Sequence, residues 1–316
     1  MLEMIMRSVF TTAFLASIIR ITTPILFAAL ASAVSERSGV ANIGLEGIMM
    51  IAALSGVLFS AWTQSAFIGV LGAGFMGVMV GLMMGFFSLK MGTDIILTGI
   101  AVNMLGGGGT IFFLYLFSGQ RGTSAALDSR MIPAVELPFL DGIPILGAFA
   151  RQSVLAYLAF LCVALVYILF YKTPLGLQIR AVGENPHAAD SVGLSVKKIS
   201  YIALGISGFL AGLGGAYMSM FASMGFSANM VAGRGFIALA AQAMGRGEPL
   251  GTMLSSLLFG TADALSNHMQ GTGLPSQLVA TIPYVITIVG LSIYTARTAK
   301  KAKRMRKAQT GSSVAA

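Results

Sequence analysis

Long apolar stretches follow one another along almost the whole chain, separated by short polar or glycine-containing segments. A helix that crosses a membrane needs about 20 predominantly apolar residues, and most of these stretches approach that length. The pattern predicts spans at about 43–62, 66–89, 94–117, 153–170, 199–222, 231–246, 250–267 and 276–296.

The first apolar stretch, about 5–34, contains Arg20 and Pro24. It is compatible with one kinked span, with a broken helix, or with an interfacial helix followed by half a span, because proline interrupts the hydrogen bonding of a helix. The side of the membrane on which this N-terminal segment starts stays open. With this segment included, the chain is expected to be all-α: a polytopic transmembrane bundle of about 8–10 spans, forming one transmembrane domain over residues 1–316.

Composition supports the bilayer as the solvent of this chain. Of its 316 residues, 56% are hydrophobic and only 10% are charged, and the mean hydropathy is +0.85. That leaves too little polar surface to coat a water-soluble globule.

The net charge of +9 gathers in the tail 297–316, after the last apolar stretch. Because basic segments beside spans are retained in the cytoplasm, we expect a cytoplasmic C-terminus. Counting spans back places segment 172–198 inside and segment 118–152 outside. The first is rich in lysine and arginine and the second balances its charges. No folded basic face accompanies the tail, so no nucleic-acid partner is expected.

The stretch from Glu46 to Ala53 shows weak sequence similarity to the stretch from Arg234 to Ala241. Each opens a glycine-rich block of about three spans, and the two blocks cross the membrane in opposite senses by the count above. This pattern is compatible with an inverted repeat, in which the transport path lies between the halves.

The stretch from Gly72 to Gly77 fits a GxGxxG pattern, but it lies inside an apolar span without the strand that a dinucleotide site requires. Spacing of four residues instead favours close helix packing. The glycines expected to pack helices in this way are Gly77, Gly81, Gly85, Gly208 and Gly212.

The sequence contains no motif or residue cluster typical of catalysis. There is no GxxxxGK[ST] loop, and the two histidines, His187 and His268, lie far apart from each other and from the single Cys162. We therefore expect no enzyme activity, no metal site and no bound cofactor, and any ATP hydrolysis must take place on a partner chain.

Segment 172–198 carries the most informative polar sequence. Asn185 followed by Pro186 predicts the start of a short helix that ends near Gly193. The stretch from Arg180 to Pro186, with Ala188, Ala189 and Gly193, resembles the cytoplasmic coupling segment of permeases in the ribose, branched-chain amino acid and nucleoside class of ABC importers.

The stretch 35–50, SERSGVANIGLEGIMM, is similar to the nucleoside and simple-sugar branch of that class. The resemblance continues through 233–240 and 259–265, and so runs through nearly the whole chain. One departure is the charged turn from Gly245 to Glu248, where the family pattern has a less charged turn with an aromatic residue.

The resemblance implies the membrane-spanning subunit of an importer that moves nucleosides across the inner (plasma) membrane. Its partners would be a second permease subunit, paralogous or identical, a cytoplasmic ATP-binding subunit and an extracytoplasmic solute-binding protein. A simple sugar such as ribose, or a branched-chain amino acid, is the alternative substrate. A secondary transporter driven by an ion gradient is the alternative mechanism.

Two sets of candidate site residues follow. The resemblance implies that the coupling segment contacts the ATPase through Arg180, Gly183, Glu184, Asn185, Pro186, Ala188, Ala189 and Gly193. Polar groups at membrane depth are costly and often functional, and aromatic rings stack on bases. The candidate translocation path therefore comprises Asn42, Glu46, Asn103, Phe112, Phe113, Phe236, Gln242 and Asp263. For the polar members, hydrogen bonding between helices is the alternative role.

Overall fold

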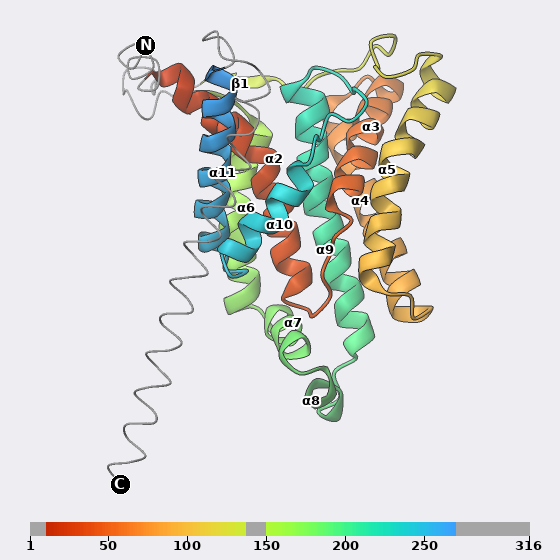
Figure 1. Ribbon diagram of the computed structural model, residues 1–316, viewed down its shortest axis with the longest axis vertical. Coiled ribbons are helices and arrows are strands. Elements are labelled where there is room, and N and C mark those ends of the chain that lie inside the picture. The colour runs from red at the N-terminus through yellow and green to blue at the C-terminus, as the bar shows by residue number, and fades with distance from the viewer. Residues whose placement is uncertain (1–10, 137–149, 270–316) are drawn as a thin grey trace. The chain divides into compact units, whose positions relative to one another are not determined.

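The computed structural model of the chain describes residues 11–136 and 150–269 (Figure 1). The chain divides into two compact units, Met1–Ala264 and Leu265–Ala316. The described part of the second unit is limited to residues 265–269. The prediction of an all-α membrane protein is confirmed.

Within the described ranges, six helices are long and apolar enough to cross a membrane. They are α2 (Thr12–Glu36), α3 (Leu45–Thr63), α4 (Ala66–Gly85) with the π-helical turn η1 (Phe86–Lys90), α5 (Ile95–Ser118), α6 (Val154–Lys172), and α9 (Val196–Tyr217) with the π-helical turn η4 (Met218–Ala222).

Two further predicted spans differ from expectation. The stretch 231–246 forms α10 (Arg234–Met244), whose 11 residues cover only about half of a hydrocarbon core roughly 30 Å thick. The stretch 250–267 forms α11 (Pro249–Met269), which is long enough to span but is not among the six candidates. The predicted span 276–296 and the basic tail 297–316 lie outside the described residues.

From Thr12 onward, the N-terminal stretch is one continuous helix rather than a broken one. α2 runs through Pro24 to Glu36, and every residue from Thr22 to Ser35 is buried. Neighbouring helices therefore surround the proline, which explains why the helix continues past a residue that lacks a backbone donor.

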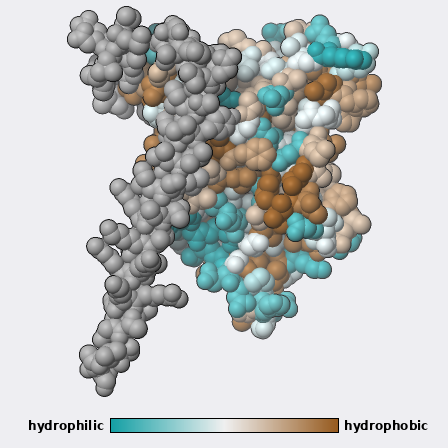
Figure 2. Space-filling view, viewed as in Figure 1, coloured by the Kyte–Doolittle hydropathy of each residue, from teal (hydrophilic) through white to brown (hydrophobic). Residues whose placement is uncertain are grey.

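Helix α9 lies at the centre of the bundle, where it packs against α2, α3 and α4. Its Tyr217 is fully buried, together with Phe27 of α2 and Met49 of α3. On the face visible in Figure 2, hydrophobic side chains cover the middle of the described part, and hydrophilic ones gather at the end that bears α7 (Pro174–Glu184) and α8 (Pro186–Ser191).

The opposite end of the bundle carries residues 119–136 and 150–153, where the short strands β1 (Ala134–Glu136) and β2 (Arg151–Ser153) pair antiparallel. Helix α6 separates these residues from α7 and α8. The described residues of segment 118–152 and those of segment 172–198 thus lie at opposite ends of a spanning helix, as the predicted topology requires.

Helices α4 and α9 touch backbone to backbone along the predicted glycines. A Cβ atom at Gly77 would collide with the carbonyl oxygen of Gly208, and one at Gly81 would lie 2.5 Å from the carbonyl oxygen of Leu204. Gly212 packs in the same seam, and Gly85 lies against the ring of Tyr201. Small residues let helices approach this closely in a membrane.

We predict that Gly77→Ala lowers the thermal midpoint of the purified protein in detergent, because overpacking a tight contact costs about 1–3 kcal/mol. Gly107→Ala is the matched control, since a Cβ atom at Gly107 on α5 meets nothing within 4 Å. The control should keep or raise the midpoint, as alanine favours helix more than glycine does. Equal midpoints for the two variants would contradict the packing role of Gly77.

Candidate functional site

Helix α3 begins inside the bundle, at the level of the middle of α5. The main-chain N–H of Gly47 donates to Oδ1 of Asn103 (2.8 Å), and Nδ2 of Asn103 donates to the carbonyl oxygen of Ile43 (3.0 Å). A Cβ atom at Gly47 would collide with the α5 backbone at Val102. Asn103 therefore satisfies backbone groups that the late start of α3 would otherwise leave unpaired within the membrane.

Asn42, in the segment just before α3, has a similar role at the start of this helix. Its Nδ2 donates to Oγ of Ser207 on α9 (2.9 Å), and its Oδ1 accepts from the main-chain N–H of Gly44 (3.1 Å). The Asn42 side chain is fully buried. Asn42 thus ties the segment between α2 and α3 to the central helix of the bundle.

The N-terminus of α10 meets the first turn of α3 at Glu46. One carboxylate oxygen of Glu46 accepts from the main-chain N–H of Gly233 (2.7 Å) and the other from that of Gly235 (2.8 Å). A Cβ atom at Gly235 would lie 2.6 Å from the backbone nitrogen of Glu46. A carboxylate at a helix N-terminus is favoured by the unpaired N–H groups there and by the helix dipole.

From this junction the two helices run to opposite ends of the bundle. At the far end of α3, Ser60 donates from Oγ to the carbonyl oxygen of Arg130, in the segment that carries β1. At the far end of α10, Gly247 accepts from Arg37, whose backbone packs against Gly183 of α7. This opposite direction matches the predicted senses of the two halves; the inverted repeat itself stays a prediction.

Asp263 on α11 also faces this region. It pairs with the guanidinium of Arg234 at 3.4 Å, and the two side chains are 19% and 23% exposed. Arg234 donates in addition to the carbonyl oxygens of Met230 and Val231. In the sequence, Arg234 was noted only as part of the possible internal repeat. It was not among the candidate path residues.

The remaining path candidates lie elsewhere. Phe112 and Phe113 are on α5, and their side chains are 62% and 47% exposed. Phe113 lines an apolar crevice of about 560 Å³ between α3, α4 and α5. Gln242 is buried at the other end of α10, beside Gly247. Phe236 is on the first turn of α10 and half exposed. The structure therefore gathers the polar candidates Asn42, Glu46 and Asn103, without the α5 aromatic pair.

The segment with the predicted short helix contains two helices. α8 begins at Pro186 as expected, with Oδ1 of Asn185 accepting from the main-chain N–H of Ala188 (3.1 Å). α7 was not predicted, although Thr173 followed by Pro174 is a typical helix start and Ile179 and Val182 share its buried face.

The two alanines of α8 have different surroundings. Ala188 is exposed, whereas Ala189 is buried in a small apolar cluster with Ile179 and Val182 of α7 and Ile199 of α9. Pro186 and Glu184 are exposed, and Gly193 has the positive φ of +83° that ends the segment. Ala188 is thus available to a partner, and Ala189 holds α8 against its neighbours.

The other two coupling candidates connect α7 to the bundle. A Cβ atom at Gly183 would collide with the carbonyl oxygen of Arg37 at the end of α2. The guanidinium carbon of Arg180 lies 5.1 Å from the ring centre of Tyr171 at the end of α6, within the range of a cation–π contact. α7 therefore contacts the ends of two spanning helices.

A similar fold occurs in a solved transporter structure. A solved inward-facing structure of an ABC transporter assigned to the metal-chelate type superposes with a TM-score of 0.51 at 14% identity, covering 88% of this chain and 84% of that one. The chain therefore shares the fold of that structure, and its six candidate spans make it a multi-pass membrane protein.

A family model described as "Branched-chain amino acid transport system / permease component" matches residues 14–291. The nucleoside ABC transporter permease protein NupC of Lactococcus lactis subsp. cremoris is 34% identical over 285 residues, or 86% of this chain and 89% of that protein. The guanosine ABC transporter permease protein NupQ of Bacillus subtilis is 35% identical over 289 residues, with 87% and 89% covered. The chain belongs to this family of permease components. It is a non-catalytic subunit, and the ATPase lies on a partner chain.

We predict that Glu46→Ala lowers the thermal midpoint in detergent, because two N–H groups at the start of α10 lose their acceptor at about 1–3 kcal/mol each. Glu46→Gln, which keeps one acceptor oxygen, should fall between Ala and wild type. The control is Asp128→Asn, an exposed carboxylate outside the helices. Midpoints that are equal for all four proteins would show that the junction does not depend on Glu46.

Proposed function

We propose that this chain is one of the two membrane-spanning subunits of an ABC importer that carries nucleosides across the inner membrane. The observation that carries the proposal is the similarity, over most of the chain, to two permease proteins named for nucleoside and guanosine transport. The polar contact between the starts of α3 and α10 supports it, because helices that begin in the middle of a bundle, next to polar side chains, are typical of transport paths.

The proposed complex contains a second permease subunit, a cytoplasmic ATP-binding subunit and an extracytoplasmic solute-binding protein. In this proposal the end that bears α7 and α8 faces the cytoplasm, together with the C-terminus. The lysines and arginines of segment 172–198 support this orientation, because basic residues concentrate on that side.

Transport in this proposal is mechanical on this chain's side. The partner ATPase presses on the exposed surface of α8, and the tight contacts of α7 with α2 and α6 pass the displacement to the spanning helices. Asn42, Glu46 and Asn103 hold the interrupted helices in register while they move. Any contact of theirs with a nucleoside would have to come in addition to the hydrogen bonds that they already make.

The substrate is tested by uptake of radiolabelled nucleosides and of ribose in cells that lack this chain, with and without its restoration. We expect nucleoside uptake to return with the chain and to vanish when the partner ATPase is inactivated. Uptake of ribose alone would replace the substrate and keep the mechanism. Nucleoside uptake that persists without ATPase activity would instead indicate a gradient-driven carrier.

The coupling role is tested by Ala188→Trp. Because Ala188 is exposed, the bulky side chain should leave the fold intact and disturb the ATPase contact, so transport falls at least tenfold while the complex still assembles. Ala126→Trp is the matched control, because Ala126 is another exposed alanine and lies at the opposite end of the bundle from α8. Uptake and ATP hydrolysis are measured on the same purified complex, and normal coupled transport in Ala188→Trp would refute the role of α8.

A further inference from the structure

The charged turn between α10 and α11, which departs from the family pattern, is a compact structure. Arg246 and Gly247 both have positive φ values, +59° and +63°. The main-chain N–H of Gly247 donates to the carbonyl oxygen of Gln242, and that of Thr252 donates to the carbonyl oxygen of Glu248. A Cβ atom at Gly245 would collide with the backbone of Thr252. The turn therefore joins α10 and the start of α11 into one stiff hairpin.

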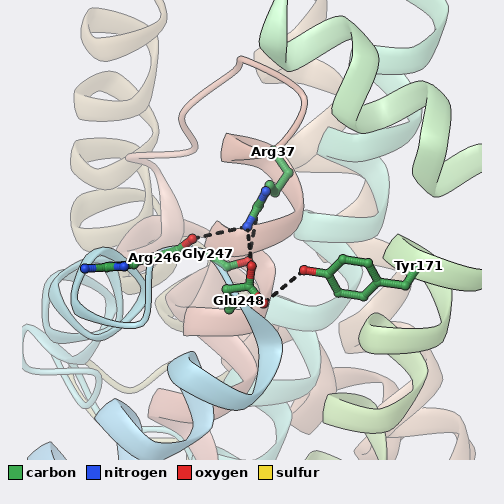
Figure 3. Close-up of polar contacts among 5 residues, drawn as sticks. All are labelled: Arg37, Tyr171, Arg246, Gly247 and Glu248. Atoms are coloured by element: carbon green, nitrogen blue, oxygen red, sulfur yellow. Dashed lines mark hydrogen bonds and ion pairs between the residues drawn. The ribbon is translucent and has the colours of Figure 1, made fainter. Parts of the chain in front are cut away.

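Glu248 binds this hairpin to the ends of two spanning helices (Figure 3). One carboxylate oxygen accepts from the guanidinium of Arg37 at 3.3 Å, and the other accepts from the hydroxyl of Tyr171 at 2.9 Å. Arg37 also donates to the carbonyl oxygens of Arg246 (3.3 Å) and Gly247 (3.4 Å). Arg37 follows the last residue of α2, and Tyr171 is in the last turn of α6.

Both partners of Glu248 are in contact with α7. The backbone of Arg37 lies against Gly183, and the ring of Tyr171 lies under the guanidinium of Arg180. Gly183 and Arg180 are three residues apart, on one face of α7. A displacement of α7 would therefore shift both groups that hold Glu248.

The surroundings leave room for this contact to open. Two cavities flank Arg37, one of about 390 Å³ towards α7 and one of about 330 Å³ towards the turn. The side chains of Arg37 and Glu248 are 30% and 51% exposed, and ion pairs in such positions are weak. Opening the pair would bury no unpaired charge, unlike the breaking of a buried ion pair.

We propose that Glu248 is a positioning residue for transport. Its bonds to Arg37 and Tyr171 form a latch that holds the α10–α11 hairpin, and movement of α7 releases it. Because α10 also meets Glu46 at its other end, the latch places the mid-bundle junction under the control of the coupling segment. The inference rests on the proposed role of α7 and α8 in coupling.

The test uses the whole transporter, purified with its ATPase and binding protein in proteoliposomes, and measures labelled nucleoside uptake and ATP hydrolysis together. Glu248→Gln removes the charge that Arg37 binds, and Tyr171→Phe removes the hydroxyl and keeps the ring under Arg180. Since an exposed ion pair changes an equilibrium a few-fold, we expect each variant to lower uptake per ATP hydrolysed by about threefold. A merely structural role would lower the yield of complex and leave this ratio unchanged.

The matched control is Glu136→Gln, an exposed carboxylate on β1, which should keep the wild-type ratio. If Glu248→Gln does not assemble, Tyr171→Phe decides. The latch is refuted if the assembled variants hydrolyse ATP and take up nucleoside in the wild-type ratio while Ala188→Trp uncouples. If the wild-type complex takes up no nucleoside, the proposed substrate fails, and the latch is then judged by whether Glu248→Gln raises basal ATP hydrolysis.

Discussion

Helices that start within the thickness of the membrane must find partners for their first N–H groups inside the protein, since lipid offers none. In this chain, α3 and α10 both start within the membrane. The first N–H groups of α10 are bound by α3, and one of those of α3 is bound by α5. Glu46 of α3 binds two N–H groups at the start of α10, and Asn103 binds the N–H of Gly47 at the start of α3. The position of both helix starts depends on these few bonds.

The spanning helices could be predicted from sequence because their length and hydropathy are set by the bilayer. Five predicted stretches between residues 43 and 222 coincide with α3, α4, α5, α6 and α9 within a few residues. α10 was wrongly predicted as a span. Its stretch is rich in alanine and glycine, which suit a buried half-helix as well as a lipid-exposed one, so hydropathy alone does not distinguish the two.

The site could be predicted only in part. The role of the polar candidates in a transport path stays a prediction; the structure shows that Asn42, Glu46 and Asn103 all make hydrogen bonds within the chain, the alternative that the sequence had left open. Phe113 was a reasonable aromatic candidate, yet it lies some ten residues further along α5 than Asn103. α7 was missed because its 11 residues are too few for an apolar span. The departure at Glu248 gained meaning only once Arg37, distant in sequence, was placed beside it.

The glycine seam between α4 and α9 has a mechanical consequence. Where the two backbones touch directly, no side chain lies between them that could change rotamer. The contact therefore cannot adjust easily, and we expect the two helices to move together as one rigid unit. α9 starts only a few residues after α8. A force applied at α8 would therefore tilt α4 and α9 together. The displacement would reach the opposite end of the bundle, where α4 begins.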